Sequence, residues 1–240
     1  MIRARLLPGV TAAALALAAP SACDWMPGRP KADAVEVRPD HVKSFEVLYG
    51  QNCAACHGPS GRGGAGAVGL ANPVYLAIAD DAVIRRAASN GVARTQMPAF
   101  ARSAGGMLTA EQIEVLVKGI RAWGKPDGLG GAAPPPYAGE AGDVDAGALV
   151  YGKFCASCHG AAGAGGAKAG SIVDGTFLGL VSNQSLRTTV IAGRPDLGQP
   201  DWRSDAAGEA LTARDVSDVV AWLAARRPAT PGQPYPEAKP

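Results

Sequence analysis

Two short stretches of the 240-residue chain decide its fold: CAACH at residues 53–57 and CASCH at residues 155–159. Both follow the pattern Cys-x-x-Cys-His, and the second begins 102 residues after the first (155 minus 53). The same offset relates further pairs outside the motifs: Tyr49 and Tyr151, Gly50 and Gly152, Gly91 and Gly193, and Pro98 and Pro200. Two tandem copies of one structural unit explain this repetition.

The motif itself predicts covalent attachment of haem c. Each cysteine thiol adds across a vinyl group of the porphyrin, and the adjacent histidine then lies under the iron as its proximal ligand. We therefore expect two haems and two irons per chain. The residues concerned form two matched sets: Cys53, Cys56 and His57 in the first copy, and Cys155, Cys158 and His159 in the second.

Paired cysteines also occur in structural zinc sites and in redox-active disulfides. A structural zinc ion takes four protein ligands, whereas each copy here supplies two cysteines and one histidine. A redox-active Cys-x-x-Cys does not require a histidine directly after it. Haem c attachment therefore explains the motif better than either alternative.

One methionine is well placed to complete the first iron site. Met97, followed by Pro98, lies 40 residues after His57 (97 minus 57). A thioether sulfur favours ferrous iron and raises its reduction potential. Met107 is the competitor, but it lies against the start of the last predicted helix of this copy, where we expect it to pack. Met97 is therefore the predicted sixth ligand.

The second copy lacks a methionine at the corresponding position. Gln199 lies 40 residues after His159 (199 minus 159), and the chain has no methionine after Met107. The sixth position is then taken by Gln199, by water or hydroxide, by Lys168, or by nothing. We expect a lower potential or a ligand-accessible iron, unless Gln199 merely fills the position and the haem still relays electrons.

The order of elements resembles the class I cytochrome c family: a helix, Cys-x-x-Cys-His, a glycine-rich loop, Met-Pro and an amphipathic helix. The resemblance covers residues 40–124 and again residues 143–227. It implies two domains whose terminal helices cross over the haem, with a loop proline supporting the proximal histidine. Pro73 is the candidate for that support in the first copy, and the second copy has no obvious counterpart.

Apolar periodicity predicts an all-α fold, and no strand pattern of useful length occurs. Helical spacing in the first copy relates Val42, Phe45, Tyr49, Cys53 and Cys56. The last helix of each copy begins with a capping pattern and continues as one apolar stripe, so we expect it to pack on the first. These helices contain Thr109, Gln112, Ile113, Leu116, Val117, Ile120 and Trp123 in the first copy, and Thr212, Asp215, Val216, Val219, Val220 and Leu223 in the second.

Composition places the domain boundaries. A linker rich in glycine and proline separates the two copies, and the last residues are rich in proline, which predicts disorder. The resulting division is a signal peptide at 1–22, a tether at 23–40, a cytochrome c domain at 41–124, a linker at 125–143, a second cytochrome c domain at 144–228 and a tail at 229–240.

The first 22 residues predict export. A basic start is followed by the apolar stretch Leu6–Ala19, which is too short to span a bilayer. Cys23 follows small residues, at the place where bacterial lipoproteins carry an acylated cysteine, although Pro20 stands where that motif has an aliphatic residue. We expect a lipid anchor at Cys23 on the periplasmic side of a membrane. Ordinary cleavage that leaves a free thiol is the alternative.

Charge excludes nucleic acid as a partner. The chain has 23 Lys and Arg against 21 Asp and Glu, and the two surplus basic residues, Arg3 and Arg5, lie in the segment expected to be removed. The mature protein would then carry no net formal charge. A nucleic-acid-binding protein would instead carry a basic surface.

The predicted function is single-electron carriage rather than catalysis. By analogy with the family, the partners are a quinol-oxidising complex and a terminal oxidase or similar acceptor. An open second iron leaves two alternatives: a peroxidase-like or sulfur-oxidising haem enzyme, and a gas- or ligand-binding module. The enzyme would need a distal acid or base, and the nearby candidates are Arg194, Asp196 and Asp201.

Overall fold

A computed structural model describes residues 37–64, 67–124, 129, 131–203 and 208–229. The predicted signal peptide, Cys23, most of the tether and most of the tail lie outside these residues. The chain divides into two compact units, residues 1–39 and 40–240, and the second unit contains both motifs. Within the described residues, no helix is both long and apolar enough to cross a membrane.

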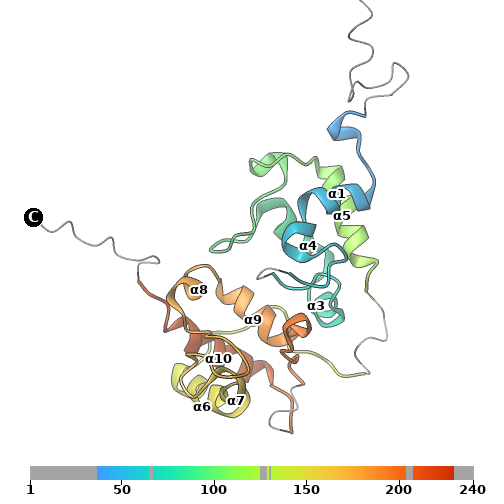
Figure 1. Ribbon diagram of the computed structural model, residues 1–240. Helices are drawn as coiled ribbons and strands as arrows, with labels where there is room; N and C mark the ends of the chain where they lie inside the picture. Colours follow the sequence, from blue (N-terminus) through green and yellow to red (C-terminus); the bar gives the residue numbers. More distant parts are fainter. Residues whose placement is uncertain (1–36, 65–66, 125–128, 130, 204–207, 230–240) are drawn as a thin grey trace, which may run out of the picture. The chain divides into compact units, whose positions relative to one another are not determined.

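The two copies have the same order of helices (Figure 1). The first domain contains α1 (Phe45–Asn52), α2 (Ala54–His57), α3 (Pro73–Ile78), α4 (Asp81–Asn90) and α5 (Ala110–Arg121), with 3-10 turns at Pro39–His41 and Arg102–Ala104. The second contains α6 (Val144–Phe154), α7 (Ala156–His159), α8 (Gly175–Gly179), α9 (Asn183–Ala192) and α10 (Ala213–Ala224), with a 3-10 turn at Pro195–Leu197. Pairing outside helices among the described residues consists of isolated β-bridges, so the all-α prediction is confirmed.

Capping residues explain where the last helices begin. The Thr109 side chain accepts a hydrogen bond from the backbone of Gln112, whose side chain accepts one from the backbone of Thr109. Thr212 and Asp215 form the same reciprocal pair at the start of α10. These capping boxes satisfy N–H groups that the first turn of a helix leaves unpaired. Both predicted capping patterns are confirmed.

The first helix differs from its predicted extent. The Ser44 side chain caps α1 by accepting from the Val47 amide, so the helix begins at Phe45 and Val42 lies outside it. The helix also stops at Cys53, and the short helix α2 begins directly after it. The break means that each motif lies at the junction of a long helix and a short one, rather than on one continuous helix.

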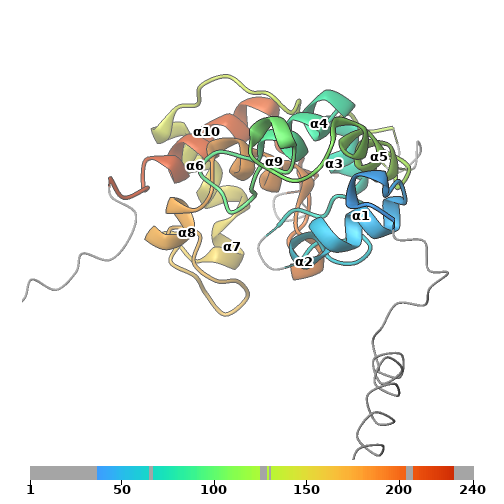
Figure 2. The same cartoon turned by 90° about the horizontal axis from the view of Figure 1, so that it is seen from above.

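Terminal helices pack together in both domains, as predicted: α1 on α5, and α6 on α10 (Figure 2). At the first crossing, a Cβ on Gly119 would collide with the Phe45 ring. At the second, a Cβ on Gly147 would collide with the Asp218 carbonyl and lie 2.8 Å from the Trp222 Cβ. Each crossing pairs a glycine with a large side chain, but opposite helices supply the glycine.

Part of the predicted linker is packed against the second domain. The buried guanidinium of Arg187 donates to the carbonyls of Pro136, at 2.9 and 3.1 Å, and Tyr137, at 3.1 Å. It also donates to the Ser217 hydroxyl at 3.1 Å. A buried arginine is stabilised by such bonds, so this stretch before α6 is fixed to α9 and α10.

Candidate haem sites

Both motif histidines are held in one geometry. The Nδ1 atom of His57 lies 2.9 Å from the Val68 carbonyl oxygen, and that of His159 lies 2.9 Å from the Gly170 carbonyl oxygen. A carbonyl can only accept, so Nδ1 must carry the proton in each ring. The Nε2 atom then keeps its lone pair, which is the form of histidine that ligates a metal.

The support for these histidines was not predicted. Pro73 is the first residue of α3, and the carbonyl that His57 contacts belongs to Val68, so the expectation that Pro73 supports His57 was wrong. The acceptors are instead backbone carbonyls 11 residues after each histidine. Because any residue type can offer a carbonyl, the only sequence signal was this spacing, which the glycine-rich loops keep equal in both copies.

The four motif cysteines form no disulfide, so both thiols of each motif are available for bonds to haem. Burial raises the pKa of Cys53 to about 11, with a smaller contribution from the neighbouring Cys56, and Cys155 beside Cys158 behaves in the same way. Burial also lowers the pKa of His57, which keeps its imidazole neutral. Two cysteines beside a neutral imidazole are the residues that covalent haem attachment uses.

A zinc site is not formed by the described residues. No group of three or more His, Cys, Asp or Glu side chains among them could hold a metal ion. Each motif instead presents one free imidazole nitrogen and two thiols, the donor set that haem c uses.

A glycine with positive φ closes each motif. Gly58 and Gly160 both have φ +79°, a conformation that side chains disfavour. A Cβ on Gly58 would also lie 2.5 Å from the Gly63 carbonyl oxygen. The tyrosine one turn before each motif strengthens the same turn, since Tyr49 donates to the Gly58 carbonyl at 2.7 Å and Tyr151 to the Gly160 carbonyl at 2.5 Å.

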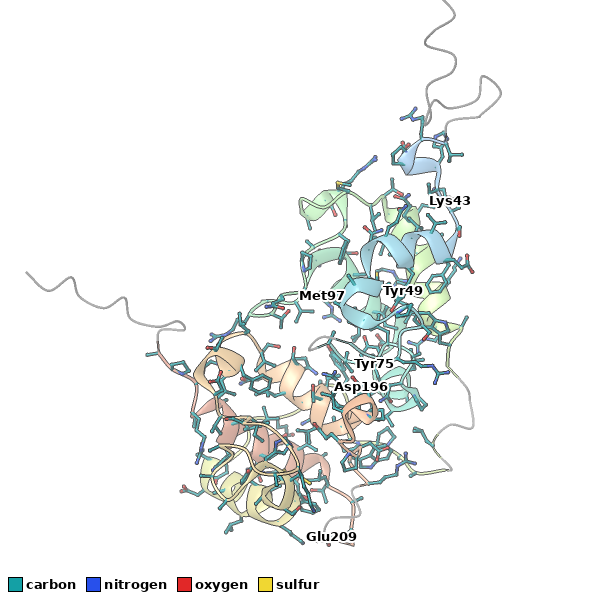
Figure 3. The ribbon with its side chains drawn as sticks, viewed as in Figure 1. Lys43, Tyr49, Tyr75, Met97, Asp196 and Glu209 are labelled. Atoms are coloured by element: carbon teal, nitrogen blue, oxygen red, sulfur yellow. The ribbon has the colours of Figure 1, made fainter. Side chains whose placement is uncertain are left out.

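Met97 and Gln199 occupy equivalent loop positions. The Val92 amide donates to the Met97 carbonyl at 3.1 Å, and the Arg194 amide donates to the Gln199 carbonyl at 3.0 Å. Met97 is half-buried in the loop after α4 (Figure 3). Met107, by contrast, is 80% exposed, so the expectation that it packs against the last helix was wrong.

The side chain of Gln199 is already hydrogen-bonded within its own domain. Its Nε2 donates to the Thr189 carbonyl of α9 at 3.3 Å. Lys168 lies on the loop whose Gly170 carbonyl binds the Nδ1 of His159. Lys168 therefore stays an alternative to Gln199 for the sixth position.

The candidate acids near the second site are all paired. Asp196 accepts from Arg194 at 2.6 and 2.9 Å, and Asp201 accepts from Arg203 at 2.6 and 3.0 Å. The hydrogen bonds from Arg194 lower the pKa of Asp196, so it stays ionised and is a poor proton donor. These groups do not offer the free acid or base that a haem enzyme needs.

Two solved structures resemble the chain distantly. The reducing HAO-like protein complex of Kuenenia stuttgartiensis aligns with 80% of this chain and 98% of its own, at 19% identity and a TM-score of 0.42. Thiosulfate dehydrogenase from Marichromatium purpuratum aligns with 82% of this chain and 48% of its own, at 19% identity and a TM-score of 0.31. Similarities of this size carry no argument about function.

Sequence comparison is more specific. The Cbb3-type cytochrome c oxidase subunit CcoP of Azospirillum sp. (strain B510) is 31% identical over 171 residues, which cover 64% of this chain and 53% of that protein. The subunit FixP of Azorhizobium caulinodans is 28% identical over 166 residues, which cover 65% and 52%. The chain spans about half the length of the curated relatives that it matches.

A family model matches the chain twice, once in each domain. The model is described as cytochrome c oxidase, cbb3-type, subunit III, and it matches residues 40–118 and 142–223. Together these ranges cover more than half of the chain, and each contains one Cys-x-x-Cys-His motif. The chain therefore belongs to the cbb3-type subunit III family, as a class I c-type cytochrome with two covalent haems c in tandem helical domains.

Proposed function

We propose that this protein carries single electrons on the periplasmic side of a bacterial membrane, from a quinol-oxidising complex to a terminal oxidase or similar acceptor. The observation that carries the proposal is the matched support of His57 and His159, each with Nδ1 bonded to a backbone carbonyl at 2.9 Å. Haem c supplies reversible one-electron chemistry, and the protein sets its potential. Among the described residues near Gln199, both acids that could serve an enzyme, Asp196 and Asp201, are paired with arginines.

Each domain then has a defined set of haem contacts. In the first, Cys53 and Cys56 form the thioether bonds, His57 is the proximal ligand and Met97 the sixth. The second is held by Cys155, Cys158 and His159, with its sixth position open to Gln199 or to water. The hydrogen bond from Gln199 to Thr189 uses Nε2, which leaves Oε1 as the atom that would bind the iron.

The relatives favour an oxidase as the electron acceptor. Those matched here are named as subunits of cbb3-type cytochrome c oxidase. This chain spans about half of their length, so its assembly with such an oxidase is part of the proposal. The identity of the donor rests on analogy with the family.

Membrane attachment is proposed to come from Cys23. Acylation there would hold both domains near membrane-bound partners through the tether. The Cys23→Ala variant should move the protein from the membrane fraction to the soluble periplasm, as seen by fractionation and haem staining. An unmodified amino terminus at a residue other than Cys23 would contradict the anchor without contradicting export.

The function is tested with the purified protein carrying both haems. Membranes with a quinol-oxidising complex should reduce it, and membranes with a terminal oxidase should reoxidise it in the presence of oxygen. The oxidation of both haems is followed by absorbance. A protein that is not cycled, but that binds CO at the second haem and turns over peroxide, would contradict the proposal in favour of an enzyme.

A further inference from the structure

A buried arginine joins the two domains. Arg194 is 7% exposed and lies in the loop between α9 and Gln199. Its Nε and Nη2 atoms donate to the two carboxylate oxygens of Asp196, at 2.9 and 2.6 Å. Nη2 also donates to the carbonyl of Gly64, a residue of the first domain, at 2.9 Å. A buried charge is costly unless it is paired, so these bonds account for the arginine at this place.

The partner of Arg194 lies in the loop that supports the first haem site. Gly64 lies in the chain between His57 and Val68. The imidazole of His57 and the carbonyl of Val68 form the hydrogen bond that supports the proximal histidine. The preceding amide, of Gly63, donates to the His57 carbonyl at 3.1 Å. A Cβ on Gly63 would lie 2.9 Å from the Asp196 carboxylate, so the ion pair rests directly on this loop.

A second contact joins the same two segments. The Asn72 side chain caps α3 through its Oδ1, which accepts from the Val74 amide at 2.8 Å. Its Nδ2 donates at 2.8 Å to the carbonyl of Ala192, at the end of α9, and this bond is buried. Asp174 caps α8 at the equivalent position but has no side-chain N–H to donate. Only the cap residue of the first domain, Asn72, can therefore donate a hydrogen bond to the other domain.

The equivalent of Arg194 in the first domain has no such role. That residue is Val92, which bonds to Met97 through its backbone as Arg194 bonds to Gln199. The loop geometry is thus repeated without the arginine. Of these two equivalent positions, only Arg194 has a charged side chain, and this side chain makes the contact with Gly64 of the first domain.

We propose that Arg194 is a positioning residue: oriented by Asp196, it fastens the loop that carries Gln199 to the loop that supports His57, and so fixes the separation of the two haem sites. This inference rests on the proposed function, because that separation matters for exchange of an electron between the haems. The exchange oxidises one iron from Fe(II) to Fe(III) and reduces the other from Fe(III) to Fe(II), with no bond made or broken.

The test compares variants of the intact two-haem protein. Arg194→Ala removes the hydrogen bonds from Arg194 to Asp196 and Gly64, which we call the Arg194 contact. Asn72→Asp keeps the α3 cap but deletes the N–H group that donates to Ala192. Lys153→Gln is the matched control, since it breaks an exposed ion pair with Glu209 and a cation–π contact with Phe154, both inside the second domain. Hydrogen exchange is measured at residues 60–72 and 192–199, together with the rate of electron equilibration between the haems after rapid partial reduction.

We expect Arg194→Ala to raise the rate of hydrogen exchange in both segments on the order of tenfold, because hydrogen bonds from a charged group are lost. Asn72→Asp should raise it less, and Lys153→Gln should not change it. Electron equilibration should slow in the same order, with two haems retained in every variant.

Three outcomes would contradict parts of this picture separately. An unchanged rate of hydrogen exchange in a variant with both Arg194→Ala and Asn72→Asp would show that the Arg194 contact does not hold the two loops together. Faster hydrogen exchange with an unchanged rate of electron equilibration would contradict the role of Arg194 in positioning the haems. Fewer than two haems in the wild-type protein would contradict the proposed function. The hydrogen-exchange measurement would still decide whether the Arg194 contact holds the two loops together.

Discussion

The two haem sites are nearly identical on one side and different on the other. On the proximal side, His57 and His159 have the same hydrogen bond at 2.9 Å, and a tyrosine braces the following turn in both domains. On the opposite side, Met97 is replaced by Gln199, whose amide is bonded to α9. The repeat has therefore kept the support of each motif histidine, and we propose that it has varied the sixth ligand, which tunes the potential.

The largest expected effect comes from deleting one attachment site. Changing Cys155 and Cys158 to Ala should leave one haem per chain, because the thioether bonds of the second domain can no longer form. The first haem should stay, since its support from Val68 is local. Mass spectrometry and a pyridine haemochrome assay give the count. Loss of both haems would show that the domains do not form independently, and retention of both would refute the attachment sites.

The two helix crossings offer the next comparison. Gly147→Ala should destabilise the second domain by about 1–3 kcal/mol, because the new Cβ meets backbone that cannot move aside. Gly119→Ala should cost the first domain less, because it meets the Phe45 ring, which can shift. Thermal unfolding followed at the haem absorbance separates the domains.

A matched control for the crossings lies on the same helix as Gly147. Gly152 has nothing within 4 Å of its ideal Cβ, so Gly152→Ala should be neutral or stabilising by about 0.5–1 kcal/mol. Equal destabilisation by the changes at positions 147 and 152 would show that the crossing is not close-packed as described.

A smaller effect should appear with pH. The hydrogen bonds from Arg194 lower the pKa of Asp196 below its ordinary value near 4. A lowered pKa in the folded protein stabilises it above that ordinary value, and the contribution is lost as the pH falls through the lowered pKa. The protection of residues 192–199 against hydrogen exchange, measured relative to the intrinsic rate at each pH, should therefore decrease in acid. Asp196→Asn should remove this dependence, and an unchanged acid response in the variant would assign it to another group.

Much of the fold could be predicted from residue types and their spacing. The tandem repeat, the capping boxes of α5 and α10 and the apolar stripe from Ile113 to Ile120 all depend on side chains that the sequence displays. The break of α1 at Cys53 was missed because apolar spacing continues across it. The exposure of Met107 was missed because proximity in sequence to a helix does not establish packing against it.

The site was predictable where side chains define it and not where the backbone does. The motif cysteines and histidines were identified directly, but the carbonyls of Val68 and Gly170 have no signature in residue type. Arg194 was considered only as a catalytic candidate, because its acceptor Gly64 is 130 residues away in the chain. Such long-range contacts depend on how the two domains meet, which local patterns do not encode.

The central claim is that the two haems differ in their sixth ligand, and a redox titration followed by absorbance tests it most directly. The wild-type protein should show two potentials, with the charge-transfer band of an Fe(III)–thioether bond for one haem. Met97→Ala should abolish this band and lower the higher potential, whereas Gln199→Met should add a second band and raise the lower one. Two equivalent thioether-ligated haems in the wild-type protein would contradict the claim, since the second domain contains no methionine.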